Sequence, residues 1–246
     1  MKHSPSLKCV IRPSFIFTIC NYVNDMPQAV SNDLLLYAED SGLTFEGKDV
    51  TIEDQRLCDW FVDNKLSIHF GDDKTKSIIF GSKRKLNKVR ELDIRCGDIK
   101  IKQQSKVKYL GCILDKDLSG ESMAIHAPGK INSRLKVLYR NQSFLNSSLR
   151  RLLCNAIIQP HYDFACLAWY PNLNKGLKKK VQTSQNKCIR FCLNMGNRDH
   201  VGVKEFKKIN WLPTKERFEQ CILANIYNFL IKPPPDIYQK CTTQLG

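Results

Sequence analysis

Short apolar runs separated by polar turns mark the first half of the chain. Residues 34–37 and 43–45 are mainly apolar and flank a tight polar turn, so the pattern predicts a β-hairpin. Residues 57–66, which include Trp60 and Phe61, are predicted to form the end of a helix. Other apolar runs predict strands at residues 66–70, 77–80, 92–95, 99–102 and 107–114.

The second half changes to the spacing of amphipathic helices. Asn146 or Ser147 can cap the first of these helices, and Pro160 is expected to end or kink it. Its apolar residues repeat at helical intervals: Leu149, Leu152, Leu153, Ala156 and Ile157. Apolar stripes within residues 177–195 and 218–230 predict two further helices, the last stopped by the prolines at 233–235. The predicted fold class is α+β, a mixed part followed by an all-helical part.

The two parts also differ in net charge. The chain of 246 residues carries a net charge of +15, with 39 Lys and Arg against 24 Asp and Glu. Residues 1–127 contribute +1 and residues 128–246 contribute +14. Such an excess favours a polyanionic partner, nucleic acid or an acidic membrane face. We therefore predict two regions, residues 1–118 and 119–246, joined by a breaker-rich connection over residues 119–129.

Composition excludes several classes of protein. An apolar fraction of 42% is too high for a disordered chain. The apolar stretch at residues 9–20 is too short to span a bilayer, and no cleavage site follows it. The 11 cysteines form no CxxC pair, which indicates reduced thiols. We expect an intracellular protein, nuclear or cytoplasmic, that is neither secreted nor bound to a membrane.

The acidic turn between the first two strands carries the candidate chemistry. It reads Tyr37-Ala38-Glu39-Asp40, and adjacent carboxylates at a hairpin tip suit Mg²⁺ beside substrate phosphates. The plain alternative is a surface hairpin that happens to carry two acids.

The surrounding motifs resemble reverse transcriptases of non-LTR retrotransposons, most closely the Jockey-type elements. The motifs that carry the likeness run in order over most of residues 20–232: 22–27, 34–42, 58–61, 64–67, 73–77, 109–115, 131–136, 152–160, 169–171 and 211–213. The resemblance implies a partial polymerase palm followed by a helical, thumb-like region. It also implies RNA-directed DNA polymerase activity, which is nucleotidyl transfer on an RNA template and a DNA primer, assisted by two Mg²⁺ ions.

The resemblance assigns roles to named residues. Glu39 stands where the family has its first catalytic Asp, and Asp40 matches the second, so both are candidate metal ligands. Lys74 matches a lysine near the nucleotide phosphates, and its alternative is a solvated turn lysine. The segment Tyr109, Leu110 and Gly111 resembles the hairpin that grips the primer end.

Two departures from the family pattern predict impaired catalysis. The family carries an upstream strand with another metal-binding Asp and then a Pro-Gln-Gly-Ser segment, and this chain shows neither. The extra methylene of Glu39 also moves its carboxylate outward, and a displacement near 1 Å costs about 100-fold in rate. We expect a truncated, decayed copy with little or no activity. The alternative function is a non-catalytic remnant that binds nucleic acid.

A basic helix supplies the candidate nucleic-acid contacts. Its cations are Lys178, Lys179, Lys180, Lys187 and Arg190, and we expect Lys178, Lys187 and Arg190 to share roughly one face. Phosphate contacts from such a face are independent of sequence and sensitive to salt. A solvated basic helix without a partner is the alternative. Three aromatic residues are open to two interpretations, base stacking or packing at helix ends: Trp169, Tyr170 and Trp211.

Other candidate sites are weaker. Gly71-Asp72-Asp73 resembles the catalytic turn of viral RNA polymerases, but a polar β-turn explains it better. Cys188 and Cys192 lie one helical turn apart on an apolar stripe, which favours core packing over metal binding. We predict no protein partner from the sequence.

Overall fold

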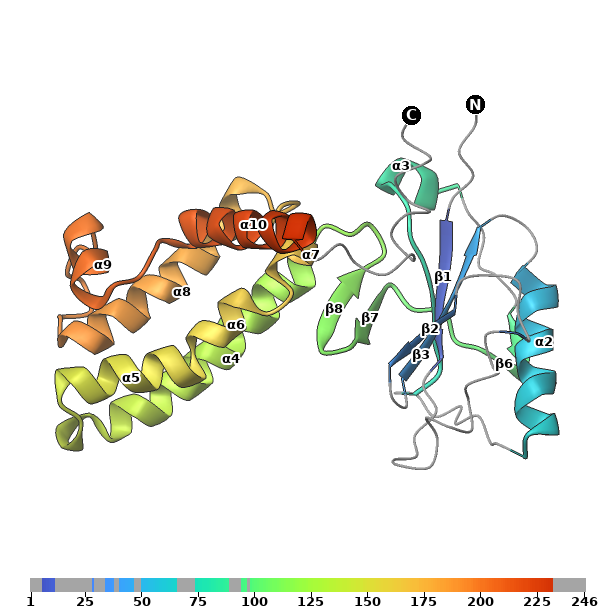
Figure 1. Ribbon diagram of the computed structural model, residues 1–246, viewed down its shortest axis with the longest axis horizontal. Coiled ribbons are helices and arrows are strands. Elements are labelled where there is room, and N and C mark those ends of the chain that lie inside the picture. Colours follow the sequence, from blue (N-terminus) through green and yellow to red (C-terminus); the bar gives the residue numbers. More distant parts are fainter. Residues whose placement is uncertain are drawn as a thin grey trace. The chain divides into compact units, whose positions relative to one another are not determined.

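The computed structural model describes residues 6–11, 28, 34–37, 40–46, 50–65, 74–88, 94–96 and 98–231 (Figure 1). The chain forms two compact units, Met1–Ser122 and Met123–Gly246. The breaker-rich connection predicted over residues 119–129 is wrong, because helix α4 (Glu121–Arg140) continues through Pro128. The division into regions at residue 118 concerns function and stays a prediction.

A four-stranded antiparallel sheet forms the centre of the first unit. Its strand order is β2-β3-β1-β4, with β1 at Ser6–Ile11, β2 at Leu34–Tyr37, β3 at Asp40–Glu46 and β4 at Lys76–Ile79. The predicted hairpin is confirmed as β2 and β3, and the strand predicted at residues 77–80 is confirmed as β4. Strand β1 was not predicted, because its partners β3 and β4 lie about 30 residues or more along the chain.

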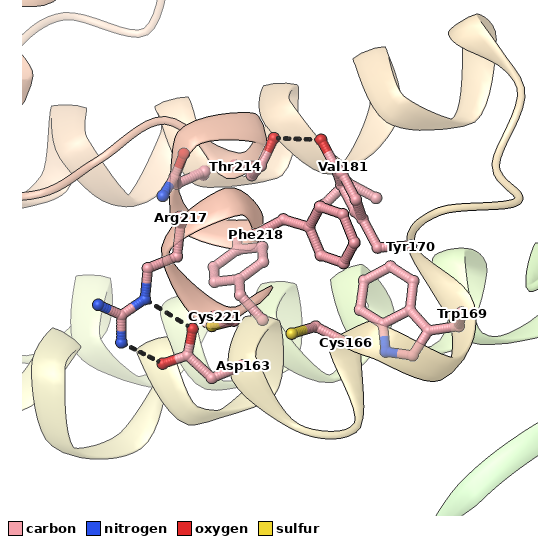
Figure 2. A pocket seen from close by; sticks show the side chains of 11 residues that line it. Asp163, Cys166, Trp169, Tyr170, Val181, Thr214, Arg217, Phe218 and Cys221 are labelled. Atoms are coloured by element: carbon pink, nitrogen blue, oxygen red, sulfur yellow. Dashed lines mark hydrogen bonds and ion pairs between the residues drawn. The ribbon is translucent and has the colours of Figure 1, made fainter. Parts of the chain in front are cut away.

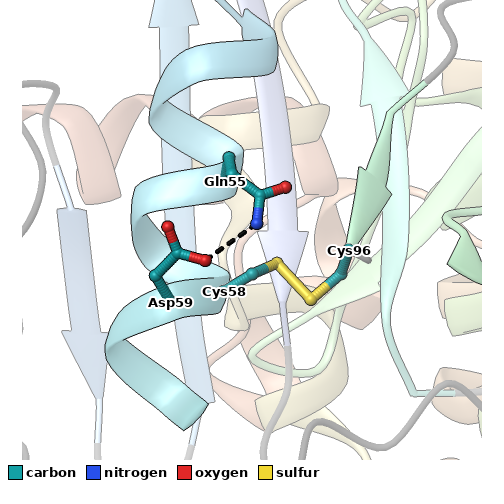
Figure 3. Close-up of a disulfide and its surroundings, with 4 residues drawn as sticks. All are labelled: Gln55, Cys58, Asp59 and Cys96. Carbon is teal, nitrogen blue, oxygen red and sulfur yellow. Dashed lines mark hydrogen bonds between the residues drawn. A yellow bond between two sulfur atoms is a disulfide. The ribbon is translucent and has the colours of Figure 1, made fainter. Parts of the chain in front are cut away.

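Helix α2 (Val50–Asp63) covers residues 57–63 of the helical segment predicted at residues 57–66, and a disulfide holds it. Cys58 of α2 is bonded to Cys96 of strand β5 (Arg95–Cys96), 38 residues along the chain (Figure 3). The expectation that all cysteines are reduced is therefore wrong for this pair. The two Cα atoms lie 5.7 Å apart, within the usual range for a disulfide. Only the folded chain brings these cysteines together, so their spacing in the sequence gives no signal.

Short elements complete the first unit. They are α3 (Lys83–Leu86), β6 (Ile99–Lys100), β7 (Lys106–Tyr109) and β8 (Cys112–Asp115). The single strand predicted at residues 107–114 is wrong, because β7 and β8 form an antiparallel hairpin with Tyr109 opposite Cys112. Leu110 and Gly111 take left-handed φ values of 46° and 83°, which reverse the chain. The strand predicted at residues 66–70 lies outside the described residues.

The second unit is helical throughout its described part. After α4 come η2 (Gln142–Phe144), α5 (Ser147–Ile157), α6 (Gln159–Asp163), α7 (Cys166–Trp169), α8 (Lys175–Leu193), α9 (Val203–Ile209) and α10 (Thr214–Ile231). The three predicted helices are confirmed as α5, α8 and α10. Asn146 is the N-cap of α5, since its side chain accepts a hydrogen bond from the Leu149 amide at 2.9 Å. Pro160 falls in the first turn of α6, where a proline is tolerated.

The core of the second unit gathers around α8. Cys188 and Ile189 are fully buried there, and Phe191 packs edge-on against Tyr139 of α4 at 4.9 Å between ring centroids. Arg150 of α5 is buried against the end of α8 and donates hydrogen bonds to four acceptors, the carbonyls of Leu145, Gln142 and Phe191 and the side chain of Asn194. No helix among the described residues is long and apolar enough to cross a membrane.

Candidate nucleic-acid interface

The tip of the β2–β3 hairpin is the predicted metal site. The strand register places Tyr37 opposite Asp40, with Ala38 and Glu39 between them in the sequence. Glu39 lies outside the described residues, and Asp40 is described by its backbone alone. Their role as metal ligands therefore stays a prediction.

Strand β1 lies directly beside the hairpin. Its last residue, Ile11, pairs with Ser41, the residue after Asp40. The sequence of β1, Ser-Leu-Lys-Cys-Val-Ile, contains no Asp or Glu. The neighbouring strand therefore supplies no carboxylate to the end of the sheet where Asp40 lies.

Lys74 comes just before the start of β4 at this same end of the sheet. Val10 of β1 pairs with Gly42 on one side and with Lys76 on the other. Two strand spacings therefore separate β3 from β4 here, which is about 10 Å. Lys74 is half-buried and precedes Lys76 by two residues. The fold thus brings the backbone of the candidate acid Lys74 and that of Asp40 to one end of the sheet.

Tyr109 of the β7–β8 hairpin lies against β3. A side-chain carbon placed on Gly42 would be 3.4 Å from the Tyr109 hydroxyl oxygen and 3.5 Å from its ring. Gly42 is only two residues beyond Asp40. The segment predicted to contact the primer, Tyr109 to Gly111, therefore begins against the strand that carries the predicted metal ligand. Leu110 is 37% exposed at the tip of its hairpin.

Helix α8 carries the predicted basic surface. Its apolar stripe is buried at Leu177, Val181 and Cys188, so the opposite side faces solvent. Three of its lysines are exposed, and the described part of the chain offers them no hydrogen bond or ion pair: Lys179, Lys180 and Lys187. Lys180 and Lys187 are seven residues apart, which places them on the same side, about 10 Å along the axis.

Two of the predicted cations make contacts within the protein instead. The Lys178 ammonium donates a hydrogen bond to the Pro171 carbonyl at 3.3 Å and lies 5.4 Å from the centre of the Tyr170 ring. Arg190 Nε donates to the Asp199 carbonyl at 2.9 Å. The expected common face of Lys178 and Lys187 is wrong, because nine residues of α-helix turn through about two and a half turns.

The aromatic candidates are packing residues. Trp169, Tyr170 and Trp211 are 2%, 5% and 8% exposed, and the indole N–H of Trp169 donates to the Phe164 carbonyl at 3.0 Å. Their rings are therefore covered by protein and do not offer a face to a base. Packing at helix ends, the second interpretation of these residues, is confirmed.

Metal binding elsewhere finds no support in the described ranges. Cys188 and Cys192 are buried in the core, as predicted. Within those ranges, no three His, Cys, Asp or Glu side chains come together in a group that could hold a metal ion. Gly71-Asp72-Asp73 and Glu39 lie outside the described residues, so the predicted Mg²⁺ site stays a prediction.

One ion pair could not be predicted from the sequence. Arg217 of α10 forms a two-pronged ion pair with Asp163 of α6, at 2.9 Å from Nε to Oδ1 and 2.8 Å from Nη2 to Oδ2 (Figure 2). These residues are 54 positions apart and belong to no recognisable motif. Only the packing of α10 on α6 reveals the pair.

No protein-family model, curated protein or solved structure matches this chain. The functional argument therefore depends on the placement of its own residues.

Proposed function

We propose that this chain is a fragment of a retrotransposon-derived reverse transcriptase that binds nucleic acid and has lost most or all of its nucleotidyl transfer. The observation that carries the proposal is the strand register around Asp40. It supports a palm-like sheet in which the acidic hairpin tip, the start of β4 and the Tyr109 hairpin lie close together.

The same register supports impaired catalysis. A two-metal mechanism needs several carboxylates that hold both ions beside the attacking and leaving oxygens. Strand β1 lies beside the hairpin without an acidic residue, and Glu39 replaces the Asp that the resemblance expects. If Mg²⁺ binds here, Asp40 and Glu39 would hold it, and the ion would neutralise charge on the transferred phosphate.

A primer-extension assay tests the catalytic half of the proposal. The chain is incubated with an RNA template, a DNA primer and deoxynucleotides in Mg²⁺ or Mn²⁺, beside the Asp40→Ala and Glu39→Asp variants. We expect little or no extension by any of the three, because Glu39→Asp restores one carboxylate position but not the carboxylate missing from β1. Robust extension by the unmodified chain that Asp40→Ala abolishes would overturn this part.

The second candidate function, a non-catalytic nucleic-acid-binding remnant, is favoured by the exposed lysines of α8. We expect salt-dependent binding to an RNA/DNA duplex that Asp40→Ala leaves unchanged. Neutralising Lys179, Lys180 and Lys187 to Gln should weaken binding and reduce the slope of log K against log salt by about two to three, close to one for each phosphate that is no longer neutralised. Neutralising Lys83, Lys85 and Lys88 to Gln, in the nearly neutral first half, is the matched control. Equal reductions in affinity from both triple variants would argue against a role for α8.

A further inference from the structure

The second unit contains a polar cleft of about 610 Å³. Its walls come from the end of α5, from α6, from the segment between α9 and α10, and from the first turns of α10. A volume of this size lies within the usual range for ligand sites, about 300 to 1,000 Å³. The cleft is separate from the lysines of α8, which do not line it.

One wall of the cleft is rigid. Trp211 is nearly buried, and its indole N–H donates to the Asn155 side-chain oxygen at 2.6 Å. Leu212, the next residue, is 41% exposed and adds an apolar surface. A ring that enters the cleft therefore meets a fixed wall with an apolar edge.

Arg217 also lines the cleft, and three of the five N–H donors of its guanidinium are engaged within the protein. Its Nε and Nη2 donate to Asp163 (Figure 2). Its Nη1 donates to Gln220 Oε1 at 2.9 Å. The carboxylate also neutralises its charge, so this group is poorly suited to bind a free anion. Its side chain is still 36% exposed. Besides its two remaining N–H groups, it offers a ligand its flat face, on which a base can stack.

Gln159 holds an unsatisfied acceptor inside the wall of the cleft. Its side-chain nitrogen donates to Asp163 Oδ1 at 3.3 Å, while its Oε1 is buried without a hydrogen-bond partner. A buried acceptor without a donor costs free energy that a ligand with an N–H group would recover. All four nucleobases can present an N–H donor when they are unpaired.

We propose that this cleft binds an unpaired nucleobase of a single-stranded nucleic acid. The base stacks on the face of Arg217, and Gln159 turns its amide into the cleft so that Oε1 accepts an N–H hydrogen bond from the base. The inference rests on the proposed function, since the phosphates of the same strand are attracted by the net charge of +14 over residues 128–246.

Two short single-stranded oligonucleotides of equal length test the proposal, one with normal bases and one with abasic sites in its interior. Both carry the same phosphates, so only the bases differ. Binding of each is measured by fluorescence anisotropy at low and high salt. We expect the oligonucleotide with bases to bind about tenfold more tightly, the effect of stacking about one base.

Three variants test whether the difference in affinity between the two oligonucleotides arises in the cleft. Gln220→Trp fills the cleft from an exposed position of α10, and Gln159→Met removes the buried acceptor. Both should bring the two oligonucleotides to equal affinity and leave binding to the abasic strand unchanged. Asn225→Trp puts the same indole on an exposed position of α10 outside the cleft and should keep the tenfold difference. The melting temperature of each variant shows that it is folded.

The outcomes separate the two proposals. Equal affinity of the unmodified protein for both oligonucleotides overturns the cleft but leaves nucleic-acid binding through phosphates intact. A tenfold difference that survives both Gln220→Trp and Gln159→Met also overturns the cleft. Failure to bind either strand at low salt overturns the cleft together with the proposed function.

Discussion

The Tyr109 ring lies against the backbone of Gly42, so that a Cβ atom at position 42 would sit 3.4 to 3.6 Å from its hydroxyl and ring atoms. That distance is ordinary van der Waals contact, which means that Ala fits at position 42 and a branched side chain does not. The contact joins the β7–β8 hairpin to β3, two residues beyond Asp40.

This contact predicts that two substitutions at position 42 differ in their effect on the free energy of unfolding. Gly42→Ala should change the free energy of unfolding by less than about 1 kcal/mol, whereas Gly42→Val should cost about 1–3 kcal/mol, because its methyl groups overlap the ring. The Gly42→Val/Tyr109→Ala double variant should recover part of that loss. Urea denaturation compares the unmodified chain with Gly42→Ala, Gly42→Val, Tyr109→Ala and the double variant. Strictly additive losses in the double variant would show that the two residues do not contact each other.

The left-handed backbone at Leu110 predicts that a substitution to glycine raises the stability of the folded chain. Leu110 has a φ of 46° at the tip of the β7–β8 hairpin, where a leucine pays a steric cost that glycine does not. Leu110→Gly should therefore raise the free energy of unfolding by about 1 kcal/mol, while Gly111→Ala, at a φ of 83°, should lower it. Denaturant melts compare the two variants with the unmodified chain. A loss of stability in Leu110→Gly would mean that the exposed side chain makes contacts worth more than the strain.

The sequence predicted the elements that depend on local pattern. The β2–β3 hairpin and helices α5, α8 and α10 follow from apolar periodicity and a capping residue such as Asn146. What it missed depends on contacts between distant residues. Strand β1 exists through its pairing with β3 and β4. The resemblance implied the hairpin at Tyr109 to Gly111, but the local pattern did not, because its turn uses a leucine where a glycine or asparagine is the usual signal.

Of the candidate site, too, the sequence predicted one part and only the structure revealed the other. Composition located the basic helix, but burial decided which lysines are available: Lys178 turned inward to Pro171, while Lys180 and Lys187 stayed exposed. The cleft around Asp163 and Arg217 had no sequence signal, because an ion pair across 54 residues has no local pattern.

The buried hydrogen bonds of Arg150 predict a large loss of stability when this residue is replaced. It is 8% exposed, and its guanidinium joins the segment around η2 to the carboxyl end of α8 through four hydrogen bonds. Arg150→Met should cost about 3 kcal/mol, because it removes four hydrogen bonds that a charged donor makes in a largely buried setting. Arg151→Met, the same change at the exposed neighbour, should stay within about 0.5 kcal/mol. Comparable losses in the two variants would contradict the anchoring role of Arg150.

The Cys58–Cys96 disulfide predicts a stability that depends on redox state. Closing a loop of 38 residues stabilises the folded chain by about 4 kcal/mol in the chain-entropy treatment. A reductant should therefore lower the melting temperature of the first unit, and the Cys58→Ala/Cys96→Ala variant should lose its sensitivity to that reductant. Peptide mapping without reduction should recover the two cysteines in one linked fragment. Separate peptides with free thiols at both positions would refute the bond in solution.

His161 predicts how stability changes with pH in the second unit. Burial lowers its pKa below the usual 6.5, and the nearby charges of Arg134, Lys130 and His126 on α4 lower it further. The unfolded chain therefore binds a proton at this position before the folded chain does, so the folded state loses stability as the pH falls below about 6.5. Above that pH the histidine is neutral in both states and contributes no slope.

The His161→Gln variant tests this assignment, since glutamine keeps a polar side chain but does not titrate. Its free energy of unfolding should fall less steeply than that of the unmodified protein between about pH 6.5 and pH 5. Histidine proton resonances measured by NMR report the pKa of His161 directly, and a value at or above 6.5 would remove the physical basis of the prediction.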